Sequence, residues 1–80
     1  MSLKGKWVET RNGDIFDIID DDGVSPFLIG AKVHYNNRKK VSKDKFSMLI
    51  ARGDILDDEY SYNTNLSNAI EAERSELNGN

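Results

Sequence analysis

The stretch from Phe27 to Tyr35 reads FLIGAKVHY, and it decides the fold. Its odd-numbered positions are all apolar, whereas glycine, lysine and histidine occupy the even-numbered positions after Leu28. The odd positions carry Phe27, Ile29, Ala31, Val33 and Tyr35. Apolar residues at every second position, several of them β-branched or aromatic, are typical of one long, half-buried strand. A single strand cannot bury its own apolar face, so we expect neighbouring strands to close over it.

Before this stretch, residues 4–19 have the pattern of a β-hairpin. The Asn12-Gly13 dipeptide predicts a two-residue turn of type I′, which requires positive φ at both central positions. That turn sets a register in which Trp7 faces Ile18. Trp7, Phe16 and Ile18 are then expected to share one face and to pack together.

After this stretch, residues 36–38 are predicted as a three-residue loop, because that length pairs Val33 with Val41 and keeps both inside. Residues 42–45 are predicted as a turn or a single 3₁₀ turn. The last strand then runs from Phe46 to Arg52, with Phe46 and Met48 turned inward. Five β segments within about 55 residues, separated by tight turns, predict an all-β fold in the form of a small five-stranded barrel.

Size and composition limit the classes of protein that the chain can be. With 80 residues the chain is predicted to form one small domain, and without cysteine it has no disulfide and no thiolate metal site. The segment MSLKGKW at the start has no apolar core of a signal peptide, and no apolar run approaches the roughly 20 residues that span a membrane. We therefore expect a cytoplasmic protein that does not associate with membranes.

Charge is strongly segregated along the chain, although the net charge is only −3. Residues 32–45 carry six lysine and arginine side chains against the single acid Asp44, while residues 9–22 and 54–76 are strongly acidic. The candidate binding residues on this basic stretch are Lys32, Tyr35, Arg38, Lys39, Lys40, Lys43 and Lys45. Such a stretch can dock a protein partner by electrostatic steering. It can also follow a phosphate backbone with a tyrosine for base stacking, or simply keep an edge strand soluble.

Residues 57–80 form a second region. Residues 57–65 are predicted as an acidic linker, and Asn68 with Glu71 has the spacing of a capped helix start, with Gly79 as its stop. The apolar stripe of this short helix is thin, so the helix is marginal alone in water. Docking on the barrel, contact with a partner and fraying remain three open alternatives.

The remaining motifs indicate no chemistry. Residues 20–23 read DDDG, but aligning Gly23 with the glycine of a calcium loop places isoleucines at both key carboxylate positions, so we interpret the segment as an acidic turn. His34 is the only histidine, and no second histidine or cysteine could complete a zinc site. The RGD tripeptide at residues 52–54 is treated as a chance match. We therefore predict a non-enzymatic protein without metal or cofactor.

The order of these segments resembles the small SH3-like barrels, most closely their Tudor and KOW-type members and the short SH3-like proteins of phages and prophages. The resemblance is carried by GKWV at residues 5–8, GDIF at 13–16, the long middle strand, the basic hairpin and VSKDKF at 41–46. It implies a barrel over residues 1–56 in which a 3₁₀ turn with a buried Phe46 introduces the last strand. It further implies a non-catalytic docking module, a phage-encoded modulator of host machinery acting in the host cytoplasm. The alternative is a nucleic-acid-binding barrel that uses the basic hairpin at 32–45.

Overall fold

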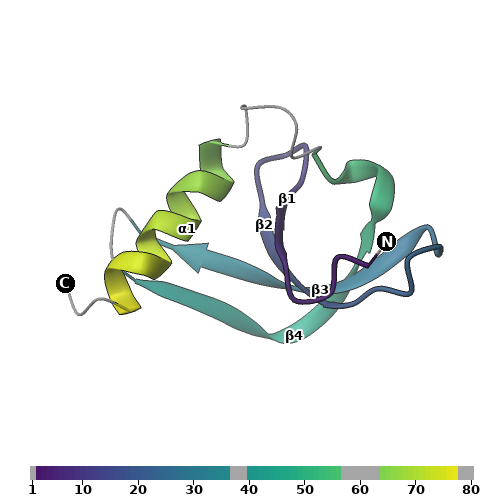
Figure 1. The fold of residues 1–80 in the computed structure, drawn as a ribbon, viewed down its shortest axis with the longest axis horizontal. Coiled ribbons are helices and arrows are strands. Elements are labelled where there is room, and N and C mark those ends of the chain that lie inside the picture. Colours follow the sequence, from purple (N-terminus) through teal and green to yellow (C-terminus); the bar gives the residue numbers. More distant parts are fainter. Residues whose placement is uncertain (1, 37–39, 57–63, 78–80) are drawn as a thin grey trace.

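The computed structural model describes residues 2–36, 40–56 and 64–77. In this part of the chain, four antiparallel strands form one sheet in the order β1-β2-β3-β4, and a single α-helix crosses one side of it (Figure 1). The elements are β1 (Trp7–Glu9), β2 (Ile15–Asp20), β3 (Phe27–Tyr35), β4 (Val41–Ala51), the 3₁₀ helix η1 (Arg52–Asp54) and α1 (Thr64–Leu77). The predicted strand at Phe27–Tyr35 is confirmed with the same bounds.

The sheet is open, so the predicted closed five-stranded barrel is wrong. Residues 42–45 form no turn but belong to β4, which is 11 residues long, and the 3₁₀ turn comes after β4 rather than before it. Two predicted segments thus merge into one strand. In the described part of the chain, residues 54–56 reach back to the end of β1. Ile55 forms an isolated bridge with Thr10, the Leu56 amide donates to the Glu9 carbonyl at 2.8 Å, and the Arg11 amide donates to the Asp54 carbonyl at 3.0 Å.

The first hairpin has a longer loop than predicted. The Thr10 amide donates to the Asp14 carbonyl at 2.9 Å, and Gly13 alone has positive φ, at 89°, so the loop has three residues. Because one residue is added, Trp7 faces Asp17 rather than Ile18. A slip of one position turns every side chain of a strand to the other face, and the predicted grouping of Trp7 with Phe16 is therefore wrong.

The second hairpin is also longer than predicted. Tyr35 pairs with Val41 and Val33 with Lys43, so the predicted pairing of Val33 with Val41 is wrong. The register differs by two positions, an even number, and both valines consequently stay on the same face. The loop between β3 and β4 includes residues 37–39, which lie outside the described residues.

The core has two clusters on opposite faces of the sheet. One contains Val8, Phe16, Ile18, Leu28 and Ile50. The other contains Ile15, Val33, Leu66 and Ala69, with Trp7, Tyr35 and Val41 packed against it half-buried. The alternation in β3 is therefore real, but both of its faces are used: Leu28 is buried on one face and Val33 on the other, whereas Phe27 is 54% exposed.

Helix α1 docks on the sheet and covers the second cluster (Figure 1), which is one of the three alternatives left open by the sequence. It begins at Thr64, four residues before the predicted start at Asn68. Ala69 and Ala72 are fully buried, and their small side chains let the helix approach closely. At the first turn, the buried Glu9 carboxylate accepts the Leu66 amide at 3.0 Å. The cap therefore comes from β1 rather than from the helix's own sequence, which is why the local cap pattern missed the start.

Candidate docking surface

Two of the basic residues predicted as a binding site, Lys32 and Lys43, lie on opposite faces of the sheet. Lys32 lies opposite Phe16 on the face of the first cluster, and its Nζ is 3.4 Å from Asp14 Oδ1. Lys43 lies opposite Val33 on the other face, and its Nζ is 2.9 Å from Asp17 Oδ2. The two lysines thus point away from each other, and each has its own carboxylate.

The other predicted site residues have different surroundings. Tyr35 is half-buried against the second cluster, so its ring belongs largely to the core. Lys40 and Lys45 are exposed on the strand side of the hairpin, and Arg38 and Lys39 lie outside the described residues. Of the predicted residues that the structure describes, only Lys40 and Lys45 are exposed lysines without a carboxylate within ion-pair distance in the described part of the chain.

Lys43 also lies close to Trp7, with its Nζ 5.7 Å from the centre of the ring. The nearby His34 Nε2 is 2.7 Å from Asp44 Oδ1, so the carboxylate of Asp44 on β4 also has a partner within the molecule. Within the described residues the β3–β4 hairpin is therefore a mixed-charge surface rather than a basic one, which weakens its ability to follow a phosphate backbone.

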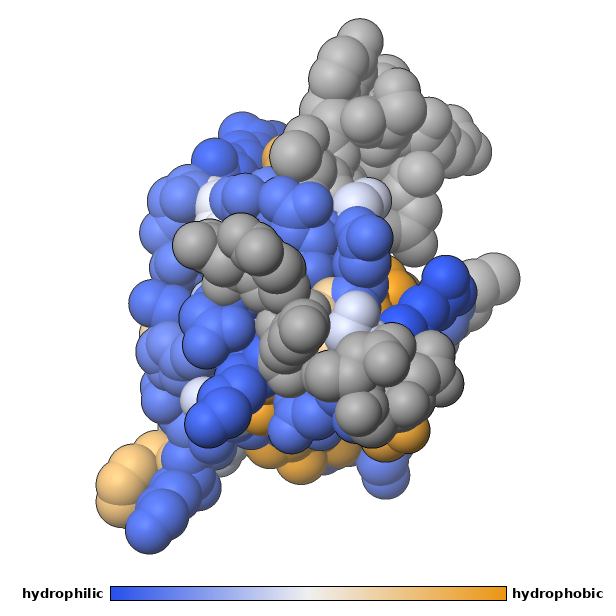
Figure 2. Space-filling model, turned by 90° about the vertical axis from the view of Figure 1, so that its left-hand side faces the viewer, coloured by the Kyte–Doolittle hydropathy of each residue, from blue (hydrophilic) through white to orange (hydrophobic). Residues whose placement is uncertain are grey.

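Strand β4 presents the most unusual surface of the molecule. Its apolar side chains Phe46, Leu49 and Met48 are 84%, 65% and 51% exposed. Within the described residues β4 pairs only with β3, so its other edge carries no strand. Figure 2 shows a mostly hydrophilic face with apolar residues gathered along its lower margin, the level at which β4 runs in Figure 1.

A β-bulge interrupts the pairing of β4 with β3 next to Phe46. Ala31 pairs with Ser47 and Val33 with Lys43, so β3 advances two residues where β4 advances four. Because the difference is an even number of residues, Lys43 and Ser47 still lie on the same face. Phe46 is 84% exposed and Met48, which pairs with Gly30 outside the bulge, is 51% exposed, so the predictions that they point into the core are wrong.

A hollow adjoins the carboxyl half of β4. It lies between residues 48–51 and the turn that joins β1 to β2, and it includes the side chains of Phe16 and Ile50, which are themselves 5% and 4% exposed. Arg11, Asp14 and Asp54 contribute charged groups to its lining. The hollow combines an apolar floor with a polar rim, an arrangement that receives a side chain of a bound chain more readily than it receives a large ligand.

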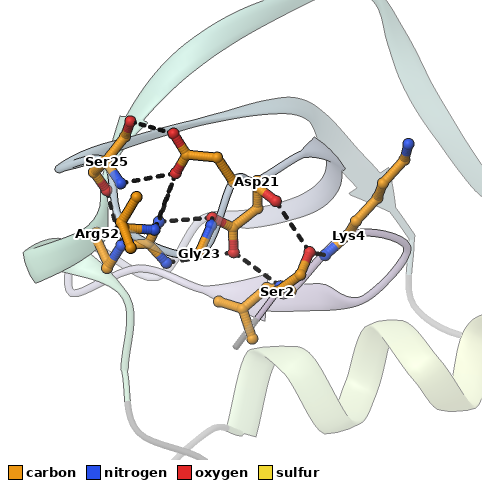
Figure 3. Close-up of polar contacts among 9 residues, drawn as sticks. Ser2, Lys4, Asp21, Gly23, Ser25 and Arg52 are labelled. Atoms are coloured by element: carbon orange, nitrogen blue, oxygen red, sulfur yellow. Dashed lines mark hydrogen bonds and ion pairs between the residues drawn. The ribbon is translucent and has the colours of Figure 1, made fainter.

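The acidic turn after β2 is a structural clamp (Figure 3). The Asp21 carboxylate, whose side chain has no exposed surface, accepts hydrogen bonds from Arg52 Nη2 at 2.6 Å and from the amides of Leu3 and Gly23 at 2.8 Å each. Arg52 also donates from Nε to the Ser25 carbonyl at 2.9 Å. Arg52 therefore ties the end of β4 to the turn and to the start of the chain.

These contacts set the ionisation of the turn. The hydrogen bond from Arg52, followed by those from the amides of Leu3 and Gly23, holds the pKa of Asp21 well below its usual range. The same pair raises the pKa of Arg52. The hydroxyl and amide of Ser25, with a further amide, lower the pKa of Asp22 from 3.8 to about 2. Sequence reasoning missed this clamp because Asp21 and Arg52 are 31 positions apart.

The described residues include neither a metal-binding cluster nor a membrane-spanning helix. They contain no group of three or more histidine, cysteine, aspartate or glutamate side chains placed to hold a metal ion. None of their helices has the length and the apolar character needed to cross a membrane.

Comparison of the chain with protein-family models, with curated proteins and with solved structures finds no match in any of the three.

Proposed function

We propose that this chain is a non-catalytic protein-binding module that receives its partner on β4. The observation that carries the proposal is the exposure of Phe46, Met48 and Leu49 on a strand with an open edge. Large exposed apolar side chains mark interaction sites, because their exposure to water is costly. Here Met48 and Leu49 flank the same strand edge from the two faces of the sheet.

The charges beside this surface support a protein partner. Lys40 and Lys45 are exposed on the same strand and its approach, and the nearby Lys43 and Asp44 already have partners in Asp17 and His34. An apolar centre with a charged margin is the usual anatomy of a protein interface, in which the apolar residues supply most of the affinity and the charges guide the encounter. The charged surface predicted from the sequence is thus the margin of the interface, and the apolar side chains are its centre.

Nucleic-acid binding has less support. The cations of the hairpin that would contact phosphates include Lys32 and Lys43, which lie on opposite faces and are paired with Asp14 and Asp17. A nucleic-acid surface needs several cations aligned along one path. We keep nucleic acid as an outcome of the test below.

The proposal predicts that Phe46→Ser combined with Leu49→Ser removes a captured partner while the protein stays folded. Both side chains are largely exposed, so their loss leaves both core clusters intact. Immobilised wild-type protein and the double variant are each incubated with lysate of the source cells, and the captured proteins are quantified by mass spectrometry. We expect the partner to fall by at least about tenfold with the double variant, as for apolar hot spots at other interfaces.

The matched control is Val24→Ser, because Val24 is 85% exposed, lies in the loop between β2 and β3 and belongs to neither core cluster. This variant should capture the partner as the wild type does. Equal capture by all three proteins would contradict the proposal. So would a capture that nuclease treatment abolishes and that falls steeply with salt, a result that would identify nucleic acid as the ligand.

A further inference from the structure

We infer that the outer edge of β4 pairs with an extended segment of a partner protein in which apolar residues precede acidic residues. The inference rests on the proposed function and adds how the partner binds and what chemistry it has. An extended segment that adds to a sheet edge gains affinity from backbone hydrogen bonds and selectivity from alternate side chains.

The backbone of β4 is available for such pairing. The strand has 11 residues, and its neighbour in the described sheet is β3 on one side only. At its first residue, the Val41 amide points away from β3 and donates to the Glu76 carboxylate of α1 at 2.9 Å. The Glu76 carboxylate therefore already satisfies one amide on the outer edge of β4. The carbonyl groups of a partner backbone would accept hydrogen bonds from the outward-pointing amides of the following residues.

The two halves of β4 differ in chemistry. The amino half, residues 43–45, carries two lysines and an aspartate, whereas the carboxyl half carries the exposed Met48 and Leu49. Lys43 and Asp44 each have an ion-pair partner within the molecule. Lys45 is therefore the charged residue of this half that has no ion-pair partner among the described residues. A segment that binds antiparallel begins opposite residues 48–50 and ends opposite residues 43–45. Its apolar residues must come first and its acidic residues must follow.

The hollow explains why the first part of the segment should be apolar. It lies beside residues 48–51, and Phe16 and Ile50 form its apolar floor. One side chain of an added strand can enter it and shield the half-exposed Met48 of its lining from water. Because side chains alternate along a strand, the next residue would point to the opposite face of the sheet, toward Leu49.

A second copy of this chain fits the edge less well. A two-fold axis through the middle of β4 would set residues 43–45 of each copy against residues 47–49 of the other, and charged side chains would face apolar ones. The bulge and Lys45 further discourage indiscriminate pairing of β4 with other edges. These features favour a partner whose charges complement Lys45.

The test uses synthetic eight-residue peptides and the full chain. The first peptide has valine and phenylalanine at alternate positions in its first half and two glutamates in its second half. A second peptide has the same residues in reversed order, and a third is the first peptide with alternate backbone amides methylated. Binding is measured by fluorescence anisotropy at low salt. We expect the first peptide to bind, and the other two to bind at least about tenfold more weakly, because one loses charge register and the other loses backbone pairing.

The protein variants test the same contact from the other side. Lys45→Glu should weaken the first peptide by about tenfold, because it replaces an attraction with a like-charge contact. Lys4→Glu is the matched control, since Lys4 is also exposed but lies near the start of the chain, and it should leave binding unchanged. Both variants should melt as the wild type does.

Three results would overturn the inference. They are equal binding of the three peptides, no binding of any of them at millimolar concentration, and a stable dimer in sedimentation that Phe46→Ser dissociates. The first two leave the proposed function standing if the double variant Phe46→Ser with Leu49→Ser still loses its captured partner. If that variant keeps its partner while the peptides bind as expected, the edge accepts strands but is not where the natural partner docks.

Discussion

Asp21→Asn is expected to lower the melting temperature by about 10 °C or more, the largest loss that we predict for a single polar substitution in this chain. The Asp21 side chain is fully buried, and its carboxylate joins Arg52 to the amides of Leu3 and Gly23. An amide in its place removes the negative charge from a fully buried position and leaves the partly exposed Arg52 guanidinium with only the more distant Asp22 carboxylate, at 4.0 Å. Thermal unfolding followed by circular dichroism measures the effect.

The matched control is Asp20→Asn, because Asp20 is the exposed neighbour in sequence. This variant should melt within about 2 °C of the wild type, since exposed substitutions change stability little. If both variants melt at the same temperature as the wild type, the clamp does not stabilise the fold.

The same carboxylate predicts how stability depends on pH. Because the pKa of Asp21 is lowered by folding, its contribution is fully present above its unfolded pKa near 3.8 and is lost as the pH falls through the lower, folded value. Asp22, with a pKa of about 2, acts in the same direction. The midpoint of urea unfolding should therefore decrease between pH 4 and pH 2. Asp21→Asn should reduce that decrease, and an equal decrease in both proteins would contradict this origin of the pH dependence.

Gly30→Val is expected to destabilise the protein by about 2–3 kcal/mol. Gly30 lies in the middle of β3, paired with Ile18 on one side and Met48 on the other. A Cβ atom there would lie 2.5 Å from Ile50 Cδ1 and 3.2 Å from the Asp17 carbonyl oxygen. The isoleucine end could move, but the backbone oxygen is fixed by the sheet, and the two γ-carbons of valine add further volume to a packed core.

The control for this prediction is Gly53→Val in η1. No atom lies within 4 Å of a Cβ built at Gly53, and its φ is not positive. Urea unfolding should therefore show a clear loss for Gly30→Val and a change below about 0.5 kcal/mol for Gly53→Val. Comparable losses for the two variants would show that the lost glycine flexibility, rather than the crowding at Ile50, determines the effect.

The strands β1, β2 and β3 could be predicted from the sequence because each has a strong local pattern, whereas residues 42–45 of β4 were wrongly predicted as a turn. The alternation at Phe27–Tyr35 gave β3 with correct bounds, and the glycine at position 13 located the first turn. The registers could not be predicted as well, because register depends on which residue of a turn adopts positive φ. Of the two residues predicted to form the first turn, Asn12 and Gly13, only Gly13 has positive φ. The resulting difference of one residue in the register moved Trp7 to the opposite face from Phe16.

The closure of the sheet and the candidate site depended on contacts between distant residues. Phe46 is 84% exposed, and no local pattern distinguishes an exposed apolar residue of a strand from one in the core. The cap that Glu9 provides for α1 joins positions 57 apart in sequence. The basic stretch was visible in the sequence, but Asp14 and Asp17, which pair with Lys32 and Lys43, belong to another strand and its turn.

The binding proposal depends most directly on the outer edge of β4 being open in the free protein, and amide hydrogen exchange followed by NMR tests this. Amides in the interior of β2 and β3 are bonded to strands on both sides and should exchange slowly. Along residues 42–49, amides bonded to β3 should be protected and those that point outward should exchange quickly, an alternation expected of an edge strand. Slow exchange at every amide of this segment would mean that another chain or segment already covers the edge, and it would contradict the account.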